Sequence, residues 1–138
     1  MQASSCQTTV TQPEAISLMV AVKKSKSEKV RAYLHQGADP NIKDPHGSTS
    51  LHWACYCDTK GVITDTLLKA GALPNVQDND GRTPLHYAVG NKHIAIKLVE
   101  MLLDAGALPN VQDNDGRTPL HLATQKDVIV QLLLQVPY

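Results

Sequence analysis

Apolar residues recur along the chain at the spacing of amphipathic helices, and short polar segments interrupt them. In the segment KLVEMLLDAGA, the apolar residues Leu98, Val99, Leu102 and Leu103 fall on one face of a helix. Gly106 follows this stripe, and glycine commonly stops a helix at the position after its C-cap. The pattern predicts a helix that buries one side and ends at this glycine.

Another helix is predicted directly after each polar segment. Thr83 and Pro84 have the residue types of an N-cap and a first helical position. Leu85 and Ala88 then lie one turn apart on the same face. The letters DNDG before them are typical of a tight turn, because Asp and Asn bond their own backbone and Gly accepts a positive φ. Each unit is therefore predicted to be turn, helix, loop, helix.

The same pattern is repeated along the chain. Residues Gly71–His86 and Gly106–His121 are identical at every position and lie 35 residues apart, and a weaker copy, Gly37–His52, lies 34 residues before the first. Because one unit cannot bury its apolar face alone, stacked neighbours are expected to form a continuous core. The predicted division is a flexible tail, 1–12, and a repeat domain, 13–138, with units at about 13–41, 42–75, 76–110 and 111–138.

These units resemble the ankyrin repeat family. The family signature Asp-x-x-Gly-x-Thr-Pro-Leu-His-x-Ala appears at 78–88 and again at 113–123. The copy Asp44–Ala54 differs once, with Ser50 in place of proline. The resemblance implies an all-α solenoid of stacked helix-turn-helix units joined by turns or short β-hairpins. It also implies that His52, His86 and His121 knit the turn backbones of adjacent repeats through hydrogen bonds.

Catalytic and metal chemistry find no support in the residue pattern. The chain has no glycine-rich phosphate loop, no zinc spacing and no nucleophile with a base. Cys55 and Cys57 lie two residues apart on a predicted helix, so they point to different sides and cannot easily share a metal. We expect a protein that is not an enzyme and that uses no cofactor and no metal.

Composition narrows the partners and the location. Among 138 residues, 13 basic and 13 acidic side chains leave no net charge to attract nucleic acid or an anionic membrane. The basic stretch KKSKSEKVR could be a nucleic-acid patch, but it lacks interleaved aromatics, so a solvated face is the expectation. The early apolar run ISLMVAV is too short to be a membrane span. Three cysteines without framework spacing favour a reducing, intracellular location, in the cytoplasm or nucleus, or in a host cell if the source is a pathogen or virus.

The resemblance places partner binding on a concave face made by the hairpin tips and the first helix of each unit. Trp53, Tyr56 and Tyr87 fall on this face, and Trp and Tyr are residue types that anchor interfaces. The alternative is that Trp53 and Tyr87 only pack between neighbouring repeats. The tip residues expected to contact a partner protein are His46, Asn79, Asp80, Arg82, Asn114, Asp115 and Arg117.

Two functions remain open. The leading hypothesis is a protein-binding module, an adaptor or effector without activity of its own. The alternative is an inhibitory regulator that sequesters a transcription factor or signalling protein, similar to the ankyrin proteins that bind Rel-type factors.

The final helix, DVIVQLLLQVPY, is apolar on most sides. It either frays or is covered, by end-to-end self-association, by a partner or by further repeats.

Overall fold

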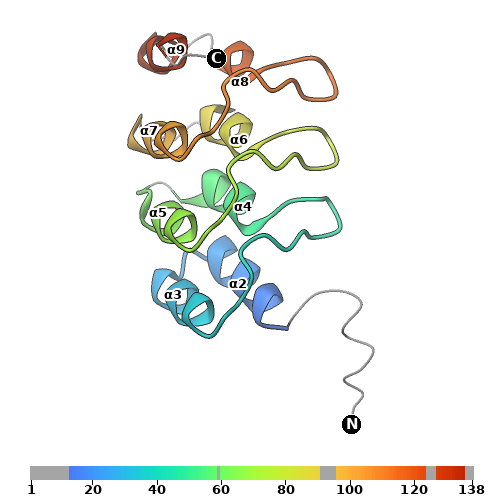
Figure 1. Ribbon diagram of the computed structural model, residues 1–138, viewed down its shortest axis with the longest axis vertical. Coiled ribbons are helices and arrows are strands. Elements are labelled where there is room, and N and C mark those ends of the chain that lie inside the picture. The colour runs from blue at the N-terminus through green and yellow to red at the C-terminus, as the bar shows by residue number, and fades with distance from the viewer. Residues whose placement is uncertain (1–12, 59, 91–95, 124–126, 136–138) are drawn as a thin grey trace.

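The computed structural model describes residues 13–58, 60–90, 96–123 and 127–135 as helices joined by turns (Figure 1). The helices are α2 (Pro13–Lys23), α3 (Ser27–His35), α4 (Ser50–Cys57), α5 (Val62–Lys69), α6 (Pro84–Gly90), α7 (Ile96–Asp104), α8 (Pro119–Leu122) and α9 (Asp127–Leu134). These residues contain no β-strand, so turns make the junctions between units. The predicted all-helical solenoid is confirmed. The proposed unit boundaries stay a prediction, and the tail, 1–12, lies outside the described residues.

The helices stack in two columns along the long axis of the molecule (Figure 1). Helices α2, α4, α6 and α8 form one column, in which each helix packs on the next. The second column holds α3, α5, α7 and α9. Three loops, residues 39–48, 74–83 and 109–118, project from the same side of the stack, next to the first column. We call them the hairpin loops.

A threonine and a histidine fix the start of the first helix in the second, third and fourth units. The backbone N–H of Thr83 donates to Nδ1 of His86 at 3.0 Å, and the Thr83 hydroxyl lies 2.9 Å from the same nitrogen. Pro84 then opens α6, as predicted, because the first helical position needs no N–H donor. The same pair recurs as Thr49 with His52 and as Thr118 with His121.

The second helix of a unit ends at a glycine with a left-handed backbone. After α7, Gly106 has φ +98°. The N–H of Gly106 donates to Leu103 at 3.0 Å, and the N–H of Ala107 donates to Leu102 at 2.9 Å. These two bonds satisfy carbonyls that the last turn would otherwise leave free. Gly106 is therefore the helix stop that the sequence pattern predicts.

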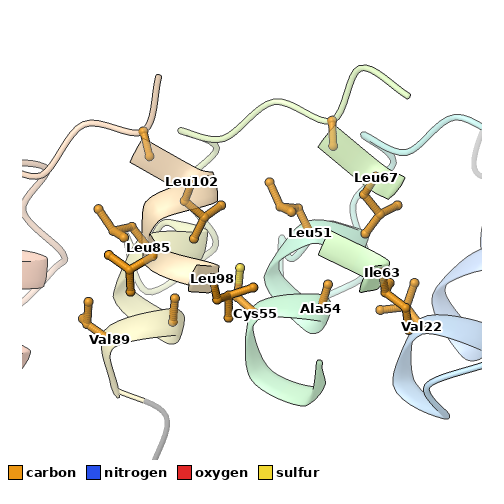
Figure 2. Packing of buried hydrophobic residues seen from close by; sticks show 14 of the residues in the cluster. Val22, Leu51, Ala54, Cys55, Ile63, Leu67, Leu85, Val89, Leu98 and Leu102 are labelled. Atoms are coloured by element: carbon orange, nitrogen blue, oxygen red, sulfur yellow. The ribbon is translucent and has the colours of Figure 1, made fainter. Parts of the chain in front are cut away.

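Leucines from successive units form one continuous core (Figure 2). Leu51 and Leu85, at equivalent positions of α4 and α6, have no exposed surface. Leu67 of α5 and Leu102 of α7 are buried to the same extent in the second column. Full burial of such a side chain stabilises the fold by roughly 1.5–3 kcal/mol. Each unit thus depends on its neighbours for burial, as the repeat pattern predicts.

Neighbouring hairpin loops are joined at their tips. The Asn79 N–H donates to the His46 carbonyl at 3.0 Å, and the Asn79 side-chain amide donates to Pro45 at 3.0 Å. One unit later, the Asn114 amide donates to the Asn79 carbonyl at 2.9 Å. Each loop also crosses the glycine of the loop before it, and Gly81 lies directly against Asn114. The loops therefore form a connected ladder rather than separate arms.

The last described helix has one buried and one exposed leucine side by side. Leu133 is 2% exposed, whereas Leu134 is 56% exposed. Val130 is partly buried against the core, while Val128, Ile129, Leu132 and Val136 lie outside the residues whose side chains are described. Self-association through this helix stays a prediction.

The two equivalent glycines of the hairpin loops should respond differently to alanine. Gly81 and Gly116 have φ +77° and +76°, so an alanine at either position should cost about 1 kcal/mol or more. At Gly81 the added Cβ would also lie 2.6 Å from Oδ1 and 2.8 Å from the backbone nitrogen of Asn114, whereas it meets nothing within 4 Å at Gly116. Gly81→Ala should therefore lower the free energy of unfolding by about 1–2 kcal/mol more than Gly116→Ala, measured by urea denaturation. Equal losses would show that Asn114 moves aside without penalty.

Alanine substitutions of the two leucines of α9 should differ in their effect on the free energy of unfolding. Leu133→Ala should lower the free energy of unfolding by about 2–4 kcal/mol, because it opens a cavity in the core. Leu134→Ala should change the free energy of unfolding by no more than about 0.5 kcal/mol.

Self-association through this helix is tested by measuring the oligomeric state of the parent and of Leu134→Lys by light scattering over a concentration series. If the parent is monomeric at high concentration, end-to-end self-association is wrong.

Candidate functional site

A pocket of about 200 Å³ opens on the first helix column beside the hairpin loops. Its walls are Ser48, His52, Trp53, Tyr56 and Tyr87, and we call it the aromatic pocket. It lies between the second and third units, since its residues come from α4, α6 and the loop before α4. The structure thus brings together all three aromatic residues that the sequence singled out.

Trp53 is held in place from several directions. Its indole N–H donates to Oδ2 of Asp44 at 2.9 Å. Nζ of Lys23, from α2, lies 4.2 Å from the centre of the indole ring. The Tyr56 ring stands edge-on to it, with 6.3 Å between centroids and 86° between planes. Trp53 is half-buried and Tyr56 is 61% exposed, so the pair presents one fixed and one accessible ring.

Tyr87 occupies the equivalent position one unit later and is held in the same way. Its hydroxyl donates to Oδ2 of Asp78, and its ring stands edge-on to His52 at 5.7 Å and 79°. Burial and the bond to Asp78 raise the pKa of Tyr87 to about 12, so the hydroxyl keeps its proton at neutral pH. Trp53 and Tyr87 therefore pack within the stack, as the alternative interpretation expects, and also line the open pocket.

The aspartates that hold these rings were not foreseen from the sequence. Oδ1 of Asp44 accepts the N–H groups of His46 and Ser48, each at 2.9 Å, while Oδ2 accepts the indole of Trp53. Burial acts to raise the pKa of Asp44, but the hydrogen bonds from Trp53 and from the Ser48 and His46 backbone outweigh it and lower that pKa. One carboxylate thus shapes the hairpin loop and orients the ring. A constant interval of nine residues between aspartate and aromatic is the signal that could have revealed it.

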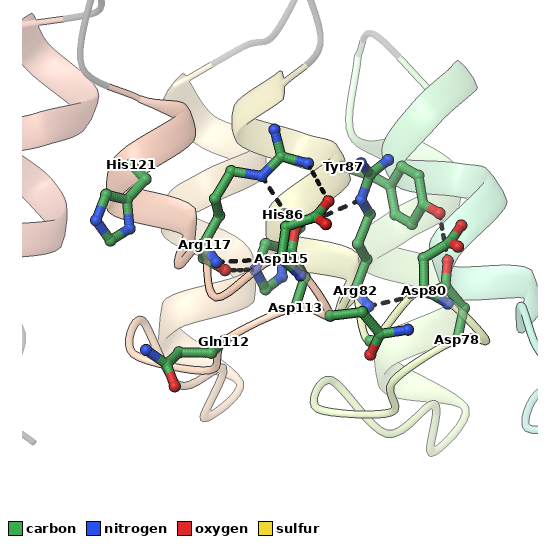
Figure 3. Close-up of polar contacts among 12 residues, drawn as sticks. Asp78, Asp80, Arg82, His86, Tyr87, Gln112, Asp113, Asp115, Arg117 and His121 are labelled. Atoms are coloured by element: carbon green, nitrogen blue, oxygen red, sulfur yellow. Dashed lines mark hydrogen bonds and ion pairs between the residues drawn. The ribbon is translucent and has the colours of Figure 1, made fainter.

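In the fourth unit the same aspartate meets a different partner, because Leu122 stands where Tyr87 stands in the third. Asp113 has a 1% exposed side chain, and its Oδ2 lies 3.7 Å from Nε of Arg82 and 3.5 Å from Nε of Arg117. Backbone hydrogen bonding from Arg117 is the main cause that lowers the pKa of Asp113, and the guanidinium charge adds to it. Figure 3 shows both arginine side chains turned toward the aspartates of this loop. Two arginines therefore neutralise the carboxylate that lacks a tyrosine.

The predicted tip residues differ in how freely they can meet a partner. Asn79 and Asn114 use their side-chain amides to join neighbouring loops. His46, Asp80 and Asp115 are exposed. Arg82 and Arg117 are half-buried in their ion pairs with Asp113, and Nη2 of Arg117 also lies 2.9 Å from Oδ2 of Asp115. The exposed tips and the aromatic pocket share one side of the stack.

His52 and His86 join neighbouring repeats as the family resemblance implies. Nε2 of His52 lies 2.9 Å from the Arg82 carbonyl, and Nε2 of His86 lies 2.9 Å from the Arg117 carbonyl. Since Nδ1 accepts the threonine N–H, the proton must sit on Nε2, which donates to the carbonyl. Burial lowers the pKa of both histidines, so they are neutral at pH 7. For His121 no such carbonyl occurs among the described residues.

Other chemistry is sparse in the described part of the chain. Among its residues, no group of three or more His, Cys, Asp or Glu side chains is arranged to hold a metal ion. Cys55 is buried and Cys57 is partly exposed, so they do face different sides. None of the described helices has the length and apolar content needed to cross a membrane.

Two family models match the chain. A model described as ankyrin repeats in three copies matches residues 18–113, and a model of a single ankyrin repeat matches residues 115–136. A search of curated proteins finds no matching sequence. The two matched segments together span both columns of the stack and the aromatic pocket.

Stability should fall as the pH drops below the ordinary pKa of histidine. The folded-state pKa values of His52 and His86 lie below the ordinary histidine value of 6.5, so the unfolded chain binds more protons in this range. Their contribution is complete above about pH 6.5 and is lost as the pH falls toward the folded values, by at most about 1.4 kcal/mol per pH unit for each histidine. Urea denaturation at successive pH values measures this slope. His86→Gln should reduce the slope, and a flat profile of the parent protein down to about pH 5 would contradict the assignment.

Proposed function

The chain belongs to the ankyrin repeat family, and we propose that it is a non-catalytic module that binds a partner protein through the aromatic pocket and the hairpin tips. Ankyrin repeats generally mediate protein–protein interaction. The family is typically a non-catalytic interaction module. The proposal therefore concerns which face of this chain binds and which residues carry the affinity.

The observation that carries the proposal is the clustering of Trp53, Tyr56 and Tyr87 around one open pocket. Large aromatic side chains supply much of the affinity of protein interfaces. Here the polar ends of two of the rings are fixed by Asp44 and Asp78, so little side-chain freedom remains to be lost on binding. The exposed Tyr56 ring is the part that can close over an inserted side chain.

The tips supply the polar rim of the same face. His46, Asp80 and Asp115 are exposed and stand on loops that the asparagine bonds hold rigid. Arg82 and Arg117 are partly exposed and pre-oriented by Asp113. A rigid polar rim around an aromatic centre is the usual anatomy of a specific interface. We include an intracellular location in the proposal, on the strength of the cysteine pattern.

Whether the module recruits or inhibits is a separate question with its own measurement. The partner is first captured with the intact chain and identified by mass spectrometry. The activity of the purified partner is then compared with and without bound chain. Retained activity supports the adaptor, and loss of activity supports the inhibitory regulator.

Truncation of the pocket aromatics should weaken partner binding sharply. Trp53→Ala and Tyr87→Ala should each cost roughly 2 kcal/mol or more of binding free energy, measured by calorimetry with the captured partner. Tyr56→Ala tests the same pocket with less risk to folding, because this ring is 61% exposed. Val62→Ala, a change of an exposed residue on α5, is the matched control. If variants with unchanged circular dichroism bind like the parent, the partner docks elsewhere.

A further inference from the structure

We propose that the aromatic pocket receives a cationic side chain, arginine or lysine, of the partner protein. The inference rests on the proposed function, since it assumes that the partner docks on this face. It adds the chemical character of the group that enters the pocket. The pocket volume, about 200 Å³, is large enough for one such side chain and too small for a folded element.

A carboxylate contacts the polar end of each of the two fixed rings, Trp53 and Tyr87. Asp44 accepts the Trp53 indole N–H, and Asp78 accepts the Tyr87 hydroxyl. The faces of aromatic rings are themselves electron-rich and attract cations within about 6 Å. Two carboxylates at the polar ends of the rings add to this attraction from outside the pocket. An anion entering the pocket would meet both ring faces and both carboxylates as repulsive groups.

One ring of the pocket already has a cation on it. Nζ of Lys23 lies 4.2 Å from the centre of the Trp53 ring, well inside the range of a cation–π contact. Lys23 comes from α2 and does not line the pocket. It therefore shows that this indole accepts a cation while it leaves the pocket itself open. Its charge should also weaken the binding of a second cation nearby.

The other groups that line the pocket carry no opposing charge. His52 is neutral at pH 7, because burial lowers its pKa. Ser48 is uncharged and can accept a hydrogen bond from a guanidinium or ammonium group. Arg82, the cation closest in sequence to Tyr87, has its Nε directed at Asp113, 3.7 Å away. A partner cation would therefore find aromatic and polar walls, and the nearby positive charge it would meet is Lys23 on the Trp53 ring.

The hairpin loops next to the pocket are rich in acidic residues, which suits a basic partner. The three hairpin loops hold six aspartates and three basic residues, although the whole chain has no net charge. On the second column, by contrast, Arg31, Lys60, Lys69 and Lys97 surround one hollow together with a single acid, Asp65. The hairpin loops beside the aromatic pocket therefore carry more acidic than basic residues. Such a field speeds the approach of a basic partner surface and orients it.

The chain contains one tryptophan, and it stands in the pocket, so its fluorescence reports on binding directly. The probes are N-acetyl-arginine amide and N-acetyl-citrulline amide, which have nearly the same shape and differ in charge. We expect a saturable change in Trp53 fluorescence with the arginine probe at matched ionic strength. The citrulline probe should bind about fivefold or more weakly.

Variants of three residues test the walls and the sign of the charge effect. Tyr87→Leu gives the pocket the residue that the fourth unit has at position 122, and it should weaken the arginine probe several-fold. Tyr56→Leu should act in the same direction with less effect on folding, since Tyr56 is exposed. Lys23→Gln removes the neighbouring cation and should strengthen the arginine probe. Val62→Ala, on α5, should leave it unchanged.

The outcomes separate this inference from the function it rests on. Equal affinity for both probes, no saturable response to the arginine probe, or weaker binding of that probe by Lys23→Gln overturns the cationic occupant. If partner binding nevertheless falls in Trp53→Ala and Tyr56→Ala, the docking face stands and its occupant is uncharged or acidic. If partner binding is also unaffected in those variants, the proposed function fails as well.

Discussion

The stacking of the repeats depends on a buried histidine whose two ring nitrogens are both satisfied. In His86, Nδ1 accepts the N–H of Thr83 at the start of its own helix, and Nε2 bonds the Arg117 carbonyl of the next unit. An unpaired buried imidazole nitrogen would be costly, so the two contacts support each other. Apolar burial alone would allow one unit to slide or turn on its neighbour. The histidine fixes one register between neighbouring units. The positions of the hairpin loops and of the aromatic pocket follow from that register.

The third and fourth units show how one different side chain changes the contacts of a loop whose sequence is otherwise identical. Their loops are identical through the histidine, and the first difference is Tyr87 against Leu122. With tyrosine, the loop aspartate orients a ring that lines the pocket. With leucine, the equivalent Asp113 is approached by Arg82 and Arg117 instead. The backbone thus serves two surfaces of different chemistry, one aromatic and one ionic.

Much of the fold could be predicted because its determinants are local. Thr83 and Pro84 start α6, and Gly106 ends α7 after its leucine stripe. Each of these signals acts on the backbone within a few residues of itself. The site could be predicted only in part, because its contacts join distant segments. Lys23 contacts Trp53 from another unit. The turn sequence around Asn79 suggests a side chain free to meet a partner, but its amide donates to Pro45 in the loop before it. Periodicity places a residue on a face, but it does not say which neighbour claims its polar atoms.

The short reach of the inter-repeat bonds has a consequence for how the chain folds. The two histidine bridges join residues only 30 and 31 positions apart, and helix packing likewise runs between neighbouring elements. A topology built from such near contacts needs little loop-closure entropy before its first stable pair of units forms. One bridge joins the second and third units and the other joins the third and fourth, so the first stable pair should include the third unit, with the remaining units adding afterwards. Folding then resembles the growth of a stack from an inner unit toward its ends.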